Sequence, residues 1–587
     1  MVFMPRIAVV DKKKCNPNGC GGYLCMRLCP INRKGEECIA KDEDGKVKID
    51  EKLCTGCGIC PNRCPFEAIS IVNLPEELAK QPIHQYGHNG FHLYNLPIPI
   101  FGKVVGILGK NGIGKSTAIQ ILAGILKPNL GKDEDANYDE IIDFFKGSEA
   151  QIFFEKIKKG EITVSYKPQQ VDLIPKQFSG TVKELLKKVD ETLRFDEIVE
   201  TLDLKHILDT KVGNISGGEL QRVAIAATVL KKANFYVFDE PTSYLDIKQR
   251  IKISKFIKKL AAEDTAVLVV EHDLIILDYM TDLIHIMFGK PGVYGIVSLP
   301  KVTRAGINTY LEGYLREQNI RFRDYSLKFF SKPPVAEQAG SELTSWKDLQ
   351  KKLGNFSLNA KEGTINKNIA VGILGENGIG KTTFVKVLAG VIEPDKGEIL
   401  QKISVSYKPQ YLETSSDTLV ATLLKDAVEK YDTQIIRPLN IKPLLLKPLN
   451  ELSGGELQRV SVAHCLSQKA DLYLLDEPSA YLDVEQRLIV SKVIRDITEQ
   501  RGCSILVVDH DLVFIDYLSD ELIVFEGIPA KEGDAKGPFA MEDGMNIFLK
   551  DLNITMRRDK ESNRPRINKP DSRMDREQKE AGKLYYT

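Results

Sequence analysis

Residues 109–117 read Gly-Lys-Asn-Gly-Ile-Gly-Lys-Ser-Thr, and residues 375–383 read Gly-Glu-Asn-Gly-Ile-Gly-Lys-Thr-Thr. Each stretch follows a mostly apolar run, 103–108 in one case and 370–374 in the other, which predicts a strand that leads into it. The shared pattern is that of a phosphate-binding loop, whose glycines let backbone N–H groups converge on phosphate at the N-terminus of a helix. Two such loops predict an α/β fold with two P-loop domains.

The side chains of these loops define the ATP contacts that we expect. Lys115 and Lys381 would reach the β- and γ-phosphates, while the hydroxyls of Ser116 and Thr382 would bind Mg²⁺. The expected ATP-binding residues of the loops are Gly109, Asn111, Gly112, Gly114, Lys115, Ser116 and Thr117, together with Gly375, Asn377, Gly378, Gly380, Lys381, Thr382 and Thr383.

An acidic pair ends an apolar strand downstream of each loop. Asp239 and Glu240 end the first of these strands, and Asp476 and Glu477 end the second. We expect each aspartate to hold Mg²⁺, directly or through water, and each glutamate to polarise the water that attacks the γ-phosphate. One phosphate loop can occur by chance, but two loops that are each followed by an acidic strand do not.

A further repeated motif lies between each loop and its acidic strand. It reads Ser216-Gly-Gly-Glu-Leu220 in the first half of the chain and Ser453-Gly-Gly-Glu-Leu457 in the second. Both stretches resemble the signature motif of the ATP-binding-cassette superfamily, except that Glu219 and Glu456 stand where most cassettes have Gln.

The resemblance to this superfamily implies that the two lobes face each other head to tail. Lys115 would then share a nucleotide with Ser453 and Gly455, and Lys381 with Ser216 and Gly218. The resemblance also implies D-loops at 243–246 and 480–483, two Q-loop glutamines that contact Mg²⁺, and two switch histidines. The implied residues are Gln169 and Gln410 for the Q-loops, His272 and His510 for the switches, and Glu240, Glu477, His272 and His510 as the catalytic set.

An aromatic residue precedes each loop at the distance at which cassettes stack a ring on adenine. Phe91 and Phe356 stand 24 and 25 residues before the lysines of their loops. Tyr86 is an alternative in the first lobe, and a plain core position is the alternative for both phenylalanines.

The two cassettes differ by an insertion. The phosphate loops are 266 residues apart but the signatures only 237, and most of the difference arises before Gln169. This places about 25 extra residues near 131–160, where the pattern predicts short amphipathic helices over 138–145 and 150–158. The insertion could pack on its own cassette, but we favour a docking surface for a partner.

Nine of the 11 cysteines lie within the first 65 residues. The run Cys54-x2-Cys57-x2-Cys60-x3-Cys64-Pro is that of bacterial ferredoxins, in which the fourth cysteine of each run binds the other cluster. Two [4Fe–4S] clusters are therefore expected, and zinc is the alternative. Cys38 is not part of either cysteine run and could be a small buried residue or a ligand. Cys465 and Cys503 are expected in the core of the cassettes. One expected ligand set is Cys15, Cys20, Cys25 and Cys64; the other is Cys29, Cys54, Cys57 and Cys60.

Composition sets the limits on these interpretations. The chain has 587 residues, of which 43% are hydrophobic and 28% charged, with a formal net charge of +0, so any nucleic-acid binding needs local patches. The sequence contains neither a signal peptide nor a long apolar run, which predicts a cytoplasmic protein without a membrane span. The expected segments are a ferredoxin-like domain (1–75), cassette 1 (76–315), a hinge (316–340), cassette 2 (341–550) and a basic C-terminal tail (551–587).

Taken together, the segments resemble the class E family of ATP-binding-cassette proteins, the ribosome-recycling factors also called RNase L inhibitors. Local phrases such as Cys64-Pro-Phe66 and Arg564-Pro-Arg-Ile-Asn568 add to this resemblance. It implies a monomer that hydrolyses ATP and splits ribosomes beside a release-factor-type protein, stays on the small subunit, and meets initiation factors.

The basic segments fit contacts with ribosomal RNA phosphates. They are 316–328 in the hinge and the tail, although 571–587 could instead be solvated and partly disordered. Two other functions remain open: the soluble ATPase subunit of a transporter, and an ATP-gated electron carrier.

Overall fold

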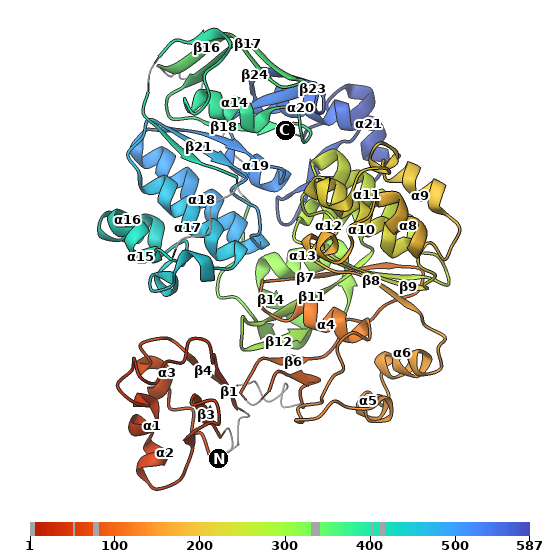
Figure 1. Cartoon of the computed structure of the whole chain (residues 1–587), viewed down its shortest axis with the longest axis vertical. Helices are drawn as coiled ribbons and strands as arrows, with labels where there is room; N and C mark the ends of the chain where they lie inside the picture. Colours follow the sequence, from red (N-terminus) through yellow and green to blue (C-terminus); the bar gives the residue numbers. More distant parts are fainter. Residues whose placement is uncertain are drawn as a thin grey trace.

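The structure is a computed structural model that describes residues 6–50, 53–73, 81–87, 89–329, 341–401, 403–410 and 417–586. The expected segment boundaries at 75/76 and 340/341 lie outside these residues. Figure 1 shows a small N-terminal domain at one end of the molecule and two larger α/β cassettes packed against each other.

The N-terminal domain is small and its core is made largely of cysteines and short aliphatic side chains. Ala8, Ile39, Val47 and Ile49 are buried together with Cys15, Cys29, Cys54 and Cys60. Two antiparallel strand pairs, β1 with β4 and β2 with β3, frame three short helices. The elements are β1 (Arg6–Val10), α1 (Leu24–Leu28), α2 (Pro30–Arg33), β2 (Ile39–Lys41), β3 (Val47–Ile49), α3 (Ile59–Arg63) and β4 (Ile69–Asn73).

Cassette 1 is built on a mixed sheet in the order β5-β6-β12-β11-β7-β10-β9-β8, with β13 beside β11. The central strands β7, β9 and β10 are parallel and wholly buried, because helices cover both of their faces. The strands are β5 (His84–Gln85), β6 (His92–Tyr94), β7 (Val104–Gly109), β8 (Val164–Lys167), β9 (Phe235–Asp239), β10 (Ala266–Val270), β11 (Leu283–Lys290), β12 (Tyr294–Val297) and β13 (Lys301–Val302).

The helices of cassette 1 carry the motifs at their ends. Ser216 caps the signature helix and Asp273 caps the helix after the switch histidine, each accepting hydrogen bonds from backbone N–H groups of the first turn. The helices are α4 (Lys115–Leu122), α5 (Tyr138–Phe144), α6 (Glu149–Lys158), α7 (Ile174–Gln177), α8 (Val182–Val189), α9 (Phe195–Thr201), α10 (Gly217–Val229), α11 (Ile247–Leu260), α12 (Leu274–Met280) and α13 (Thr303–Glu312).

Helices α5 and α6 occupy the insertion. Phe153 and Phe154 are buried in the core of cassette 1, and the Phe153 ring packs edge-on against Phe235 of β9 with centroids 5.6 Å apart. The apolar face of the insertion therefore packs on its own cassette. On the outside, Tyr138 and Ile152 remain exposed.

Cassette 2 repeats this plan in a nine-stranded sheet of order β19-β16-β17-β24-β23-β18-β22-β21-β20. Its strands are β16 (Glu342–Leu353), β17 (Phe356–Asn366), β18 (Ala370–Leu374), β19 (Lys396–Ile399), β20 (Val405–Lys408), β21 (Leu472–Asp476), β22 (Ser504–Val508), β23 (Glu521–Ile528) and β24 (Glu532–Ala540). Its helices are α14 (Lys381–Leu388), α15 (Val420–Leu423), α16 (Lys425–Lys430), α17 (Gly454–Ser467), α18 (Val484–Arg501), α19 (Leu512–Leu518) and α20 (Met541–Leu552), the last of which crosses the expected boundary at 550.

The described part of the hinge, residues 316–329, and the tail up to residue 586 are folded. In the hinge, β15 (Ile320–Arg321) pairs with β14 (Tyr314–Leu315) at the end of cassette 1. The tail forms the hairpin β25 (Met556–Arg558) and β26 (Pro565–Ile567), followed by α21 (Arg573–Ala581). Tyr585 is buried in a hydrophobic cluster that also includes side chains of both cassettes. The alternative of a disordered tail over 571–587 is therefore wrong for the described residues up to 586.

Candidate functional site: two ATP sites and a cysteine-lined domain

The two phosphate loops have the same geometry. Lys115 Nζ donates to the carbonyl oxygens of Gly109 and Lys110 at 3.0 and 2.6 Å, so the buried ammonium group lies over its own loop. Lys381 Nζ contacts Gly375 and Glu376 in the same way, at 2.9 and 2.5 Å. Each lysine is thus positioned at the place where the loop would receive phosphate.

The aromatic residues expected near adenine lie against the loops. Gly114 and Gly380 have φ values of 87° and 91°, and a Cβ built on either would come within 2.7 Å of the ring of Phe91 or Phe356. Tyr86 also reaches the first loop, with its hydroxyl 3.1 Å from Thr117 Oγ1. Phe91 and Tyr86, the two residues considered for stacking on adenine in the first lobe, therefore both lie beside the first phosphate loop.

A hydroxyl and a carboxylate face each other where Mg²⁺ is expected. Ser116 Oγ lies 3.1 Å from Asp239 Oδ2, and Thr382 Oγ1 lies 2.8 Å from Asp476 Oδ2. Burial, with the charge of Glu240 next in importance, raises the pKa of Asp239 to about 6, and burial also raises the pKa of Asp476. These oxygen atoms are hard ligands that suit Mg²⁺, which would also relieve the buried negative charge.

Each glutamate predicted to be catalytic is held between a glutamine and a histidine. Gln169 Nε2 donates to Glu240 Oε1 at 2.7 Å, and His272 Nε2 lies 3.5 Å from the same oxygen. Glu477 has the same neighbours, Gln410 at 2.8 Å and His510 at 3.7 Å. The structure therefore brings the predicted glutamate, Q-loop and switch residues together in both cassettes.

The two glutamates share a strained backbone but differ in acidity. Both have a φ of 47°, in the left-handed region that side chains other than glycine rarely adopt. Burial would raise both pKa values, but the nearby His272 ring and the charge of Lys115 lower the pKa of Glu240 to about 2. The pKa of Glu477 stays raised, because burial and Asp476 outweigh Gln410 and Lys381.

Sequence reasoning missed two further residues in each site. Lys167 is fully buried and its Nζ donates to the carbonyl of Asp239 at 2.9 Å, while Gln221 Nε2 donates to the carbonyl of Glu240 at 2.7 Å. Lys408 and Gln458 do the same for the second acidic pair. Their repetition in the sequence could have revealed these residues, because the motifs Tyr-Lys-Pro-Gln and Leu-Gln-Arg-Val occur in both halves of the chain.

The cassettes meet head to tail through their D-loops. The backbone N–H of Asn111 donates to Asp483 Oδ2 at 3.0 Å, and its side chain donates to the Tyr481 carbonyl at 3.4 Å. Asn377 contacts Asp246 and Tyr244 of the other lobe at 3.0 and 3.3 Å. Each phosphate loop therefore touches the D-loop of the opposite cassette.

The signature motifs are adjacent to these contacts. A Cβ built on Gly455 would come within 3.0 Å of the Tyr481 carbonyl, the same oxygen that accepts from Asn111. Each signature hydroxyl donates to the glutamate of its own capping box, Ser216 to Glu219 at 2.7 Å and Ser453 to Glu456 at 3.0 Å. The hydroxyls of both serines are thus held within their own cassettes.

One of the two expected cysteine sets lines a cavity of the N-terminal domain. Cys15, Cys20, Cys25 and Cys64 line one cavity together with Tyr23 and Phe66. The spare Cys38 is buried beside Cys29 and Cys54, and burial followed by these neighbours raises the pKa of its thiol. Within the described part of the chain, no three His, Cys, Asp or Glu side chains form a group that could hold a single metal ion. Cys465 and Cys503 are buried core residues, as expected.

One asparagine joins the N-terminal domain to the first ATP site. Asn89 is buried, donates from its side chain to the carbonyls of Ala8 and Ile49, and accepts from the Ile49 N–H at 2.7 Å. The loop that carries it also holds Tyr86 and Phe91, the residues that reach the phosphate loop. A single short loop therefore touches both units.

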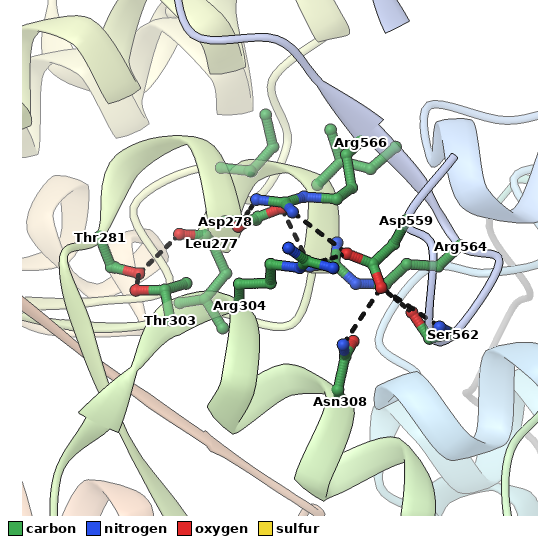
Figure 2. A network of polar contacts seen from close by, with 12 residues as sticks. Leu277, Asp278, Thr281, Thr303, Arg304, Asn308, Asp559, Ser562, Arg564 and Arg566 are labelled. Atoms are coloured by element: carbon green, nitrogen blue, oxygen red, sulfur yellow. Dashed lines mark hydrogen bonds and ion pairs between the residues drawn. The ribbon is translucent and has the colours of Figure 1, made fainter. Parts of the chain in front are cut away.

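The tail is fastened to both cassettes, and Figure 2 shows its contacts with cassette 1. Arg564, whose side chain is 0% exposed, bonds Asp278 of α12 at 2.9 Å, and Arg566 bonds the same carboxylate at 2.5 Å. The equivalent residue of α19, Asp516, accepts from Tyr586 at 2.7 Å and also from Tyr585. The tail thus straps together the helices that follow the two switch histidines.

This packing excludes two arginines of the basic segments from the expected RNA contacts. Arg564 is buried in the strap, and Arg323 of the hinge is buried against Glu485 and the carbonyls of Tyr310 and Leu311. These two arginines stabilise the fold and cannot reach RNA. Arg316, in contrast, is 74% exposed.

Comparisons with known proteins agree with this architecture. Family models match residues 100–243 and 358–480 (ABC transporter), 5–37 (possible Fer4-like domain in RNase L inhibitor, RLI) and 47–70 (4Fe-4S binding domain). In the part of the chain that the structure describes, every helix is too short or too polar to cross a bilayer. Fold and site together define a twin-cassette ATPase with an N-terminal iron–sulfur domain.

Full-length relatives identify the family. The chain is 44% identical to ABC transporter E family member 1 of Arabidopsis thaliana and 53% identical to an uncharacterised ABC transporter ATP-binding protein of Methanocaldococcus jannaschii, over 99% of this chain and at least 97% of each relative. The chain belongs to the E family of ATP-binding-cassette proteins. A solved structure described as a model of ribosome-bound archaeal Pelota and ABCE1 superposes with a TM-score of 0.94 at 53% identity, over 100% of both chains.

Proposed function

We propose that this protein is an ATP-driven ribosome-recycling factor, which splits ribosomes into subunits after termination beside a release-factor-type partner. One observation carries the proposal: the similarity to the ribosome-bound archaeal structure covers both ATP sites, the cysteine domain and the tail at 53% identity. The chain would act as a monomer in the cytoplasm, remain on the small subunit after splitting, and meet initiation factors there.

ATP would close the two cassettes around their D-loop contacts. The signature hydroxyls of Ser216 and Ser453 would give up their hydrogen bonds to the glutamates of their own helices. They would then donate to the γ-phosphate in the opposite loop, beside Gly218 and Gly455. Because these bonds exist only in the closed state, ATP binds that state better than the open one and shifts the population towards it. Lys115 and Lys381 would exchange their loop carbonyls for phosphate oxygens.

Hydrolysis would follow from the residues around the acidic pairs. Glu240 and Glu477 are held in position to orient the attacking water, and His272 and His510 would contact the γ-phosphate beside them. Mg²⁺, held by Ser116, Asp239 and Gln169 or by Thr382, Asp476 and Gln410, would neutralise phosphate charge. Phe91 and Phe356 would stack on adenine.

The N-terminal domain would transmit the movement. Two [4Fe–4S] clusters, bound by the two sets of cysteines given above, would cross-link a domain that has few other core residues. Asn89 would carry movement of the first ATP site to this domain through the loop of Tyr86 and Phe91. On the ribosome, exposed Arg316 would contact RNA phosphate, and the outer face of the insertion at Tyr138 and Ile152 would dock on a partner.

Sucrose-gradient profiles of ribosomes test the proposal. With ATP, Mg²⁺ and a release-factor-type protein, the wild-type chain should convert whole ribosomes into subunits. The double variant Glu240→Gln, Glu477→Gln should stay bound to small subunits, because it closes but cannot hydrolyse ATP. Ribosomes that remain whole under all conditions, including EDTA-free buffers with excess ATP, would refute the proposal.

Iron analysis tests the clusters separately. Two clusters predict about eight iron atoms per chain. Cys57→Ser should lower this content, while Cys38→Ser, a matched change at the spare cysteine, should retain it. Equal loss in the two variants would make Cys38 a ligand.

A further inference from the structure

The two interfaces between the cassettes repeat the same contacts. The N–H of Asn111 donates to Asp483, and the N–H of Asn377 donates to Asp246, both at 3.0 Å. The residues on each side are identical in the two cassettes, as are the D-loop tyrosines whose carbonyls accept the asparagine side chains. These contacts would form equally well between two copies of the same cassette, so they cannot select the partner.

One pair of positions differs in the sign of its charge. The residue after the first glycine of the loop is Lys110 in cassette 1 and Glu376 in cassette 2. The residue that faces it, two positions after the D-loop aspartate of the other lobe, is Glu485 in one interface and Lys248 in the other. Lys110 Nζ lies 2.9 Å from Glu485 Oε2, and Lys248 Nζ lies 2.6 Å from Glu376 Oε1.

From this reversal we infer a charge code that makes cassette 1 close on cassette 2 and rejects closure of like cassettes from two copies of the chain. Pairing of two first cassettes would place Lys110 against Lys248, and pairing of two second cassettes would place Glu376 against Glu485. Each like pair would bring this repulsion at both of its interfaces, while the unlike pair has attraction at both. Specificity of this kind needs a repulsive element as well as an attractive one.

The code has a role when the cassettes open. A chain whose cassettes separate beyond the contacts described above presents two phosphate loops and two D-loops to any other chain in solution, and the identical contacts alone would allow pairing in trans. The repulsion removes the like pairings, and the tether between the cassettes favours the unlike pairing within one chain through its high effective concentration.

The two ion pairs differ in burial and in their other contacts, and this difference decides which pair the experiment changes. Glu485 is 9% exposed and is also bound by Arg323 and Tyr325 of the hinge, so its replacement would disturb the hinge. The side chains of Lys248 and Glu376 are 49% and 29% exposed, which allows substitution without loss of folding. The test therefore uses this second pair.

The experiment measures closure and mass in the hydrolysis-deficient full-length chain carrying Glu240→Gln and Glu477→Gln. Closure is followed by energy transfer between a dye on each cassette during ATP titration, and mass by light scattering. Lys248→Glu makes cassette 1 self-complementary and sets the new carboxylate against that of Glu376 within the chain. We expect about a tenfold rise in the ATP concentration for half closure, and ATP-dependent dimers at a few hundred micromolar chain, near the effective concentration of a tether.

The reverted pair and a matched control complete the design. Lys248→Glu with Glu376→Lys should close within about twofold of the parent and remain monomeric, since attraction within the chain is restored. Lys255→Glu, an exposed position on the same helix about two turns beyond Lys248, should match the parent. A Lys248→Glu chain that closes normally or never dimerises, or a double reversal as impaired as the single change, would overturn the charge code.

The inference rests on the proposed ATP-driven closure, and the two can fail separately. If the parent chain does not close with ATP, the proposed function fails. If the parent closes but all the charge variants behave alike, only the code fails.

Discussion

Removal of the Asp278 carboxylate should release the tail from cassette 1. In Asp278→Ala, Arg564 would keep its 0% exposure but lose its carboxylate partner, and Arg566 would retain only Asp559, at 3.1 Å. Breaking a buried ion pair by removing one partner costs about 3–5 kcal/mol. Because Arg566 keeps one carboxylate, we expect the lower end of this range, about 3 kcal/mol.

Hydrogen exchange of the hairpin β25–β26 measures this loss directly. A cost of about 3 kcal/mol corresponds to roughly a 150-fold faster exchange of amides that open with the hairpin, since 1.36 kcal/mol is a factor of ten. Glu577→Ala, which breaks the exposed pair with Arg573 on α21, should leave exchange of the hairpin unchanged. Hairpin exchange that is the same in Asp278→Ala and wild type would refute the strap.

Three further predictions concern the ATP sites. Lys167→Met removes the buried ammonium that holds the carbonyl of Asp239, so turnover should fall by about 100-fold with little change in KM, and an equal rise in KM would contradict a positioning role. Gly455→Ala would bring a methyl group within 3.0 Å of the Tyr481 carbonyl, which should lower steady-state ATPase turnover by at least about tenfold; full turnover would show that this approach is not needed. Burial, then Asp273 and Glu240, raise the pKa of Glu271 to about 7, above its unfolded value of about 4.3. Between these two pH values the folded state holds a proton on Glu271 that the unfolded state has lost, so the contribution of Glu271 to the free energy of unfolding is lost as pH rises from about 4.3 through about 7. Glu271→Gln should therefore flatten that part of a profile of stability against pH. An unchanged slope would show that another group causes the pH dependence.

Local sequence patterns were sufficient for much of the fold and of both ATP sites. Phosphate loops, acidic strand ends and signature caps are each short, and their function depends on residues that are close in sequence. The structure accordingly places Glu240 beside Gln169 and His272, as the motifs predict. The internal repeat also exposed the insertion, because two copies of one domain make any extra segment visible.

Contacts between residues far apart in sequence could not be predicted in this way. Arg564 and Asp278 are 286 positions apart, and nothing near either residue reveals the other. A basic tail is equally suited to RNA, solvent or a buried aspartate, so the RNA interpretation was wrong for Arg564. The same limit applies to Asn89, whose polar side chain gave no sign that it would be buried in another domain.

The strap also has a place in the order in which the protein is made. The tail follows both cassettes in the chain, so both can acquire their own cores during synthesis before any of Arg564, Tyr585 or Tyr586 exists to join them. A chain broken off after α20 would carry two complete sets of ATP-binding motifs but no connection between Asp278 and Asp516. The strap therefore adds a connection between the cassettes that only a chain synthesised through the tail can form.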